Sequence, residues 1–136
     1  MACLDTSLLL DATGKSGRNS RAQARRKLDT LVAVGEVLTT TRFNVAELWV
    51  GVERSRDHAA EVRAVEGILE PLMILEFDEA GARMFGRLTA ALQARGAPRG
   101  DMDVLIASVA LVHGEWIVTR NTRHFESIPG LRVEGY

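Results

Sequence analysis

Carboxylates recur in this sequence at the borders of apolar runs. Asp5 ends the first apolar run, Glu47 lies inside "VAELWVGV", and Asp101 and Asp103 open "DMDVLIASVALVHG". Carboxylates that gather in one place repel one another, so they need protons, basic side chains or a cation nearby. Because no histidine or cysteine shares this pattern with an obvious ligand spacing, the set suits a hard ion that prefers oxygen, Mg²⁺ or Mn²⁺.

An ion of this kind would suit the hydrolysis of a phosphodiester. Mg²⁺ held by a few carboxylates keeps several waters, and one of these can attack a phosphodiester. A neighbouring carboxylate can orient or deprotonate that water. Hydroxyl and amide side chains could position the water or a phosphate, and the sequence offers Thr6 and Ser7 after Asp5, and Thr119 and Asn121 near the other end.

Each of these residues also has a simpler structural interpretation. Asp5, before two hydroxyl residues, is typical of a helix cap. Glu47 is typical of a solvated helix surface, and Asp101 and Asp103 are acids that the first turn of a helix favours. Asn121 is an ordinary turn residue. The site therefore depends on whether the fold brings these residues together.

Apolar runs alternate with helical patterns along the chain. Strands are predicted at 2–4, 36–40, 72–77 and 115–119, with 131–136 as a possible fifth at an edge. Helices are predicted at 19–35, 41–55, 57–70, 78–96 and 101–114. This alternation predicts an α/β fold in which a mainly parallel sheet of four to five strands is flanked by helices.

Such a sheet would bring the acids to one edge, because ligands of α/β sheets bind beyond the carboxyl ends of the strands. Asp5 follows the first strand, and residues 119–121 follow the fourth. The helix at 101–114 leads into that fourth strand, so its first turn, with Asp103, lies near the same edge. Glu47 lies about 7–8 Å along a helix that starts there.

Length and composition fit one domain, residues 1–136, of an ordinary globular class. Cys3 is the only cysteine, so no disulfide forms within the chain and Cys3 is expected to be a small buried hydrophobe. No apolar run is long enough to span a membrane, and a cytoplasmic location is expected. The net charge of −1 argues against a non-specific nucleic-acid binder, but not against an enzyme that handles nucleic acid through a metal.

Four stretches of the chain carry a family resemblance. They are "LDTSLLL" at 4–10, "VAELWVGV" at 45–52, "GDMDVLIASVALVHG" at 100–114 and "VTRNTRHFESIPGLRV" at 118–133. In this combination and order the chain resembles PIN-domain ribonucleases, specifically VapC-type toxins of toxin–antitoxin pairs, over essentially its whole length. The resemblance implies a PIN-like, Rossmann-like three-layer fold and a metal-dependent endoribonuclease that cuts tRNA or ribosomal RNA and so inhibits translation.

The resemblance also implies site residues and partners. Acids at the positions of Asp5, Glu47 and Asp103 hold Mg²⁺ or Mn²⁺ in this family. A homodimer is expected, together with a VapB-type antitoxin whose tail covers the acidic pocket. The helix pair around 42–70, with Trp49, looks like the part of the toxin that grips this antitoxin.

Two positions depart from the family pattern. Asn121 stands where many PIN domains have a fourth acid, and it adds no charge for a second ion. His124 stands where relatives often have an acid, which leaves Asp101 as the spare acid nearby, expected to support the site without binding the metal itself.

Two other functions are compatible with parts of the pattern. One is a PIN-like interaction module without catalytic activity. The other is a haloacid-dehalogenase-like phosphatase with Asp5 as nucleophile, although such enzymes want a second aspartate two residues later, where this chain has Ser7. The basic run from Arg18 to Lys27 is typical of a solvated helix face, and phosphate contact is its alternative role.

Overall fold

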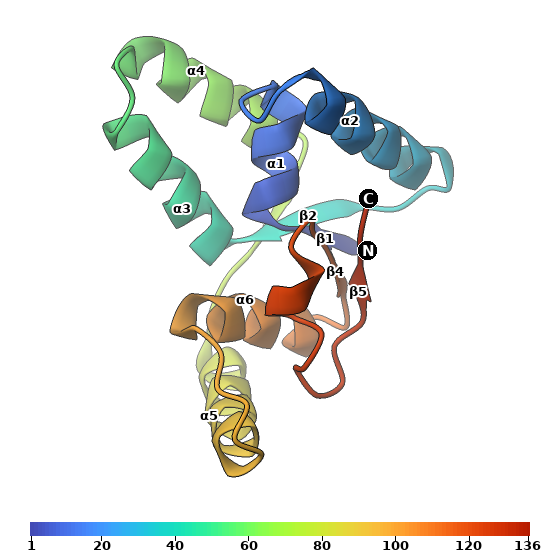
Figure 1. Ribbon diagram of the computed structural model, residues 1–136, viewed down its shortest axis with the longest axis vertical. Coiled ribbons are helices and arrows are strands. Elements are labelled where there is room, and N and C mark those ends of the chain that lie inside the picture. Colours follow the sequence, from blue (N-terminus) through green and yellow to red (C-terminus); the bar gives the residue numbers. More distant parts are fainter.

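The computed structural model describes residues 1–136 and contains one five-stranded sheet (Figure 1). Its strands are β1 (Ala2–Leu4), β2 (Leu38–Thr41), β3 (Met73–Leu75), β4 (Trp116–Val118) and β5 (Val133–Glu134). Their order is β3-β2-β1-β4-β5, and every neighbouring pair is parallel. The predicted α/β class and the fifth strand at an edge are confirmed.

Six helices and one short 3-10 helix connect these strands. They are α1 (Thr6–Thr13), α2 (Arg18–Ala33), α3 (Arg42–Glu53), α4 (His58–Leu69), α5 (Glu79–Ala94), α6 (Asp101–Val112) and η1 (Thr122–His124). In Figure 1, α1 to α4 lie on one side of the sheet and α5 and α6 on the other, which gives the expected three layers. None of these helices is both long and apolar enough to cross a membrane.

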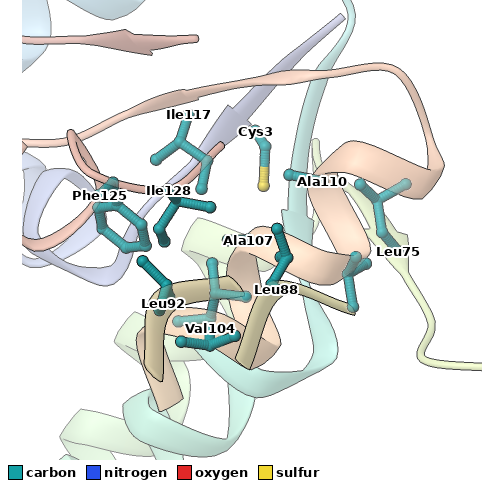
Figure 2. Close-up of a cluster of buried hydrophobic side chains, with 12 residues drawn as sticks. Cys3, Leu75, Leu88, Leu92, Val104, Ala107, Ala110, Ile117, Phe125 and Ile128 are labelled. Carbon is teal, nitrogen blue, oxygen red and sulfur yellow. The ribbon is translucent and has the colours of Figure 1, made fainter. Parts of the chain in front are cut away.

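Alternate residues of the central strands feed two hydrophobic cores, because side chains of a strand point to opposite faces in turn. Cys3 and Ile117 face α5 and α6 in one core (Figure 2). Leu4 and Val118 belong to the other core, with residues of α1 to α4. Cys3 is fully buried, as predicted. The strands β1 and β4 are thus packed against hydrophobic side chains on both faces of the sheet.

The strand order reverses at β1. The chain passes from β1 to β2 and β3 on one side, and later returns to place β4 on the other side of β1. Crevices that bind ligands form at such a reversal, outside the carboxyl ends of the strands. Asp5 directly follows β1 and Thr119 directly follows β4, so both lie at this point of the sheet.

Candidate active site

A polar pocket of about 320 Å³ lies at this carboxyl edge. Three of its lining residues are carboxylates, and they come from the end of β1, from α3 and from α6. The lining consists of Asp5, Thr6, Ser7, Leu10, Glu47, Asp103, Arg120, Asn121 and His124. The fold therefore brings together the three acids that chain direction placed at one edge.

Asp5 is held by hydrogen bonds from three separate segments. Asn44 Nδ2 donates to its Oδ1 at 3.1 Å. The hydroxyls of Ser7 and Thr119 donate to its Oδ2 at 3.1 and 2.7 Å. Asp5 occupies the N-cap position of α1, but its side chain makes no capping hydrogen bond. Its carboxylate is instead oriented at the floor of the pocket.

Asn44 was not predicted as a site residue. Its place three residues after Thr41, where a helix begins, has the spacing of a capping box and was the signal that could have found it. It forms a capping box with Thr41 at the start of α3, in which Asn44 N donates to Thr41 Oγ1 and Thr41 N donates to Asn44 Oδ1, both at 3.2 Å. This arrangement leaves Nδ2 free to donate to Asp5, and also to Thr6 Oγ1 at 3.0 Å. The helix cap thus supplies the donor for the pocket floor.

Glu47 projects from the second turn of α3 and is half-buried. Thr6 Oγ1 donates to its Oε1 at 2.9 Å. Burial raises the pKa of Glu47, and the nearby charges of Asp5 and Asp103 raise it further, while the Thr6 hydrogen bond acts in the opposite direction. The acids of the pocket therefore affect one another electrostatically.

Asp103 lies in the first turn of α6 and faces His124. Its Oδ2 is 3.3 Å from His124 Nδ1. Burial raises the pKa of Asp103, and Asp5 adds to the rise, whereas His124 and Arg99 lower it. His124, noted in the sequence only as a departure from an acid, is in contact with one of the candidate metal ligands.

The supporting residues fall into two groups. Thr6, Ser7 and Asn121 line the pocket, as needed to position a water or a phosphate. Thr119 is fully buried behind Asp5, where it donates to Asp5 and accepts from Asn121 N at 3.0 Å, so its role is to orient the carboxylate and the loop. Asp101 is exposed and does not line this pocket.

The position of Asp101 corrects the expectation that it supports the site. It lies two residues before Asp103, and this spacing on a helix turns its side chain away from the side on which Asp103 lies. Asp101 instead lines a separate small pocket with residues of α5 and of the loop before α6. We therefore leave it out of the candidate site.

The donor set suits a hard divalent cation, since all three acidic ligands offer carboxylate oxygens. No three acidic, histidine or cysteine side chains are close enough in this arrangement to ligate one ion directly, so at least one of the three carboxylates would contact the ion through a bound water. Waters would have to complete the shell of the ion, which is usual for Mg²⁺. A phosphatase with Asp5 as nucleophile gains no support, because no lysine lines the pocket.

Comparison with known proteins places these features in context. Residues 2–131 match the model of the PIN domain family. The chain is 38% identical over 104 residues to the tRNA(fMet)-specific endonuclease VapC of Salmonella typhimurium, which covers 73% of this chain and 79% of that protein. It is 31% identical over 134 residues to ribonuclease VapC19 of Mycobacterium tuberculosis, which covers 97% and 98%.

Solved structures agree with the fold. VapBC2 of Rickettsia felis, bound to a DNA fragment from its promoter, superposes with a TM-score of 0.88 at 27% identity, over 99% of this chain and 98% of that one. DNA-bound VapBC of Salmonella typhimurium superposes with a TM-score of 0.85 at 28% identity, over 98% and 96%.

Proposed function

The chain belongs to the PIN domain family, among its VapC ribonucleases, and on this premise we propose that it is a toxin endoribonuclease whose Asp5, Glu47 and Asp103 hold Mg²⁺ or Mn²⁺. Residues 1–136 would act as a single PIN domain. The observation that carries the proposal is the convergence of these three carboxylates, from three separate elements, on one pocket at the reversal point of the sheet.

Each side chain of the pocket has a distinct task in this proposal. The bound ion would neutralise the carboxylates and polarise the phosphodiester of the RNA. Asp5, fixed by its three donors, sets the position of the ion. Glu47 orients the attacking water and accepts its proton, for which a pKa raised by burial is suited. The Asn121 amide lines the pocket where it can donate to phosphate oxygens, whereas the Ser7 hydroxyl donates to Asp5 and so orients that carboxylate.

The proposal is tested by cleavage of RNA with and without the metal. The purified protein should cut RNA in Mg²⁺ or Mn²⁺ and stop when a chelator is added. Asp103→Asn should slow cleavage by at least about a hundredfold, because it removes a ligand charge. Asp101→Asn is the matched control on the same helix turn, and it should leave the rate unchanged.

The same assay separates the alternatives. An Asp103→Asn variant that cuts as fast as the parent would exclude this carboxylate from the site. A parent protein that cuts no RNA in either metal would favour the inactive interaction module.

We propose tRNA or ribosomal RNA as the substrate, and therefore the cytoplasm as the place of action. Support for tRNA comes from the Salmonella relative, which is named a tRNA(fMet)-specific endonuclease.

The proposed partners are a VapB-type antitoxin and a second copy of the chain. The VapBC complexes support the antitoxin, because their toxin chains have the fold of this one. Trp49 is half-buried on α3, beside exposed Val50, and both line a shallow apolar depression on that helix. Trp49→Ala should weaken capture of the antitoxin without loss of RNA cleavage, and sedimentation of the free toxin would test the dimer.

A further inference from the structure

A buried carboxylate beside the pocket has no part in the proposed function. Asp11 lies on α1 and is 0% exposed. Arg120 Nη1 donates to its two oxygens at 2.7 and 2.9 Å, and Tyr136 Oη donates to Oδ2 at 2.6 Å. A buried charge is costly unless it is paired and hydrogen-bonded. Asp11 satisfies this condition through Arg120, a residue that it shares with the pocket.

Arg120 is only partly used by this contact. Its side chain is 45% exposed and lines the polar pocket with the three acids. Of its side-chain nitrogens only Nη1 makes a hydrogen bond, so Nε and Nη2 keep their donors free. Its backbone N donates to Ser7 Oγ at 3.1 Å, which fixes the residue against the pocket floor.

The free edge of this guanidinium matches the chemistry of a phosphate. Nε and Nη2 together form a planar fork that binds phosphate oxygens in a bidentate manner. A phosphodiester that enters a pocket with three carboxylates meets repulsion, and Arg120 is the one lining residue that stays cationic at every physiological pH. Asp11 holds the opposite edge, so little side-chain entropy remains to be lost on binding.

We infer that Arg120 binds a non-bridging phosphate oxygen of the RNA at the rim of the pocket, and that Asp11 and Tyr136 are positioning residues that aim its free edge. The inference rests on the proposed function, because it requires RNA to be the substrate. The alternative is an ion pair that serves only to neutralise Asp11.

A pair of variants separates these two roles. Arg120→Gln alone would strand a buried charge and could unfold the protein, so Asp11→Asn serves as the common background. Asp11→Asn keeps the cation, whereas Asp11→Asn with Arg120→Gln removes it and leaves a neutral pair. Binding of a short fluorescein-labelled single-stranded RNA is measured by anisotropy at several salt concentrations in a chelator, so that cleavage plays no part.

The double variant should bind the RNA about tenfold more weakly than Asp11→Asn. The slope of log affinity against log salt should also become shallower by about 0.7, the value for one phosphate contact on a single strand. Arg87→Gln, an equal charge change at an exposed position on α5, should change neither quantity. Parallel thermal denaturation should show that the compared variants are folded.

Equal affinities and equal salt slopes for the two variants would overturn the inference and leave Arg120 a structural ion pair. A parent protein that does not bind RNA would overturn it as well. A parent protein that binds RNA but does not cut it in Mg²⁺ or Mn²⁺, with the expected difference between the variants, would support the phosphate contact and count against the proposed catalysis alone.

Discussion

At the scale of single residues, the floor of the pocket is defined by neutral donors. Asp5 accepts hydrogen bonds from an amide and two hydroxyls, and no basic side chain pairs with it. Neutral donors orient the oxygens of a carboxylate without cancelling its charge. The full negative charge therefore remains available to a cation, whereas Asp11 nearby has its charge matched by Arg120.

Asn44 should matter to activity beyond its part in stability. Asn44→Ala removes the capping box and one donor to Asp5, and we expect a loss of about 2 kcal/mol in the free energy of unfolding. Asp78→Ala is the matched control, because Asp78 caps α5 through Gly81 N at 3.0 Å and does not line the pocket. It should cost about 1 kcal/mol.

Urea unfolding and RNA cleavage measured on both variants decide the point. Cleavage should fall at least about tenfold in Asn44→Ala, at a temperature where both variants are folded, and stay at the parental rate in Asp78→Ala. Parental activity in Asn44→Ala would show that the amide is no more than a helix cap.

Glu115 predicts a pH dependence of stability that is separate from the site. Its side chain is buried, its Oε1 has no partner, and burial raises its pKa above the ordinary 4.5, with the Thr39 hydroxyl as its one donor. Well below pH 4.5 the carboxyl is neutral in both the folded and unfolded states. As pH rises above this value, the unfolded chain ionises first, so Glu115 increasingly destabilises the fold until the folded form ionises too.

Glu115→Gln should therefore unfold at higher urea than the parent at about pH 8, and the advantage should shrink towards about pH 4. The difference between the two proteins isolates Glu115 from the other acids, because those titrate in both. An advantage of the same size at both pH values would mean that Glu115 does not carry the raised pKa.

At the scale of elements, most site residues lie where a strand ends or a helix begins. Asp5 follows β1, Thr119 follows β4, and Asp103 lies in the first turn of α6.

The position of α3 depends on a further contact, in which Phe43 packs edge-on against Phe77, with ring centroids 5.2 Å apart. Phe77 lies in the connection from β3 to α5. This aromatic pair therefore ties the first turn of α3, with its capping box, to the layer on the other side of the sheet.

Two glycines of α5 test this aromatic contact. A Cβ on Gly81 would lie 2.9 Å from the Phe77 ring, whereas a Cβ on Gly86 would meet nothing within 4 Å. Gly86→Ala should stabilise the protein by up to about 1 kcal/mol, as alanine does in an open helix position. Gly81→Ala should give no gain or a loss, because the Phe77 ring, which packs against Phe43, must shift to make room for the added Cβ.

Thermal unfolding of the two variants is the measurement, and the Gly86→Ala protein is the control for helix propensity. If Gly81→Ala stabilised the chain as much as Gly86→Ala does, the Phe77 ring would be free to move, and the connection between α3 and α5 would be weaker than the structure indicates.

The direction of the chain was sufficient to predict that Asp5, Glu47 and Asp103 lie near one another, because the carboxyl ends of parallel strands meet at one edge of the sheet. It could not supply Asn44 or the Asp11–Arg120 pair, since these depend on side-chain directions between segments up to 109 residues apart. The helix α1 was considered only through Asp5 as a possible cap, and its range was not predicted. Its sequence "TSLLLDAT" has a continuous apolar run that shows no helical period, because the helix is buried on most of its surface.

At the scale of the whole molecule, the proposed ligands come from both sides of the sheet. Glu47 belongs to α3 in one outer layer, Asp103 belongs to α6 in the other, and Asp5 lies at the sheet between them (Figure 1). A cation held by all three would join the layers. It would bind the folded chain alone, since the unfolded chain separates these residues.

Mn²⁺ should therefore raise the melting temperature. At about a hundred times its Kd the ion would add about 2.7 kcal/mol, which is roughly 10 °C for a chain of this size. The shift should vanish in Asp5→Asn and persist in Asp101→Asn, and calorimetry without any RNA measures it. An equal shift in Asp5→Asn would place the ion elsewhere on the molecule.

The contact between Asp5 and Thr119 joins residues 114 positions apart in the chain. The floor of the pocket can therefore form only after the chain up to Thr119 has left the ribosome. A nascent chain that still holds β4 in the exit tunnel has Asp5 but neither its Thr119 donor nor the loop with Arg120. Products of interrupted translation that end before β4 would therefore lack the complete floor of the pocket.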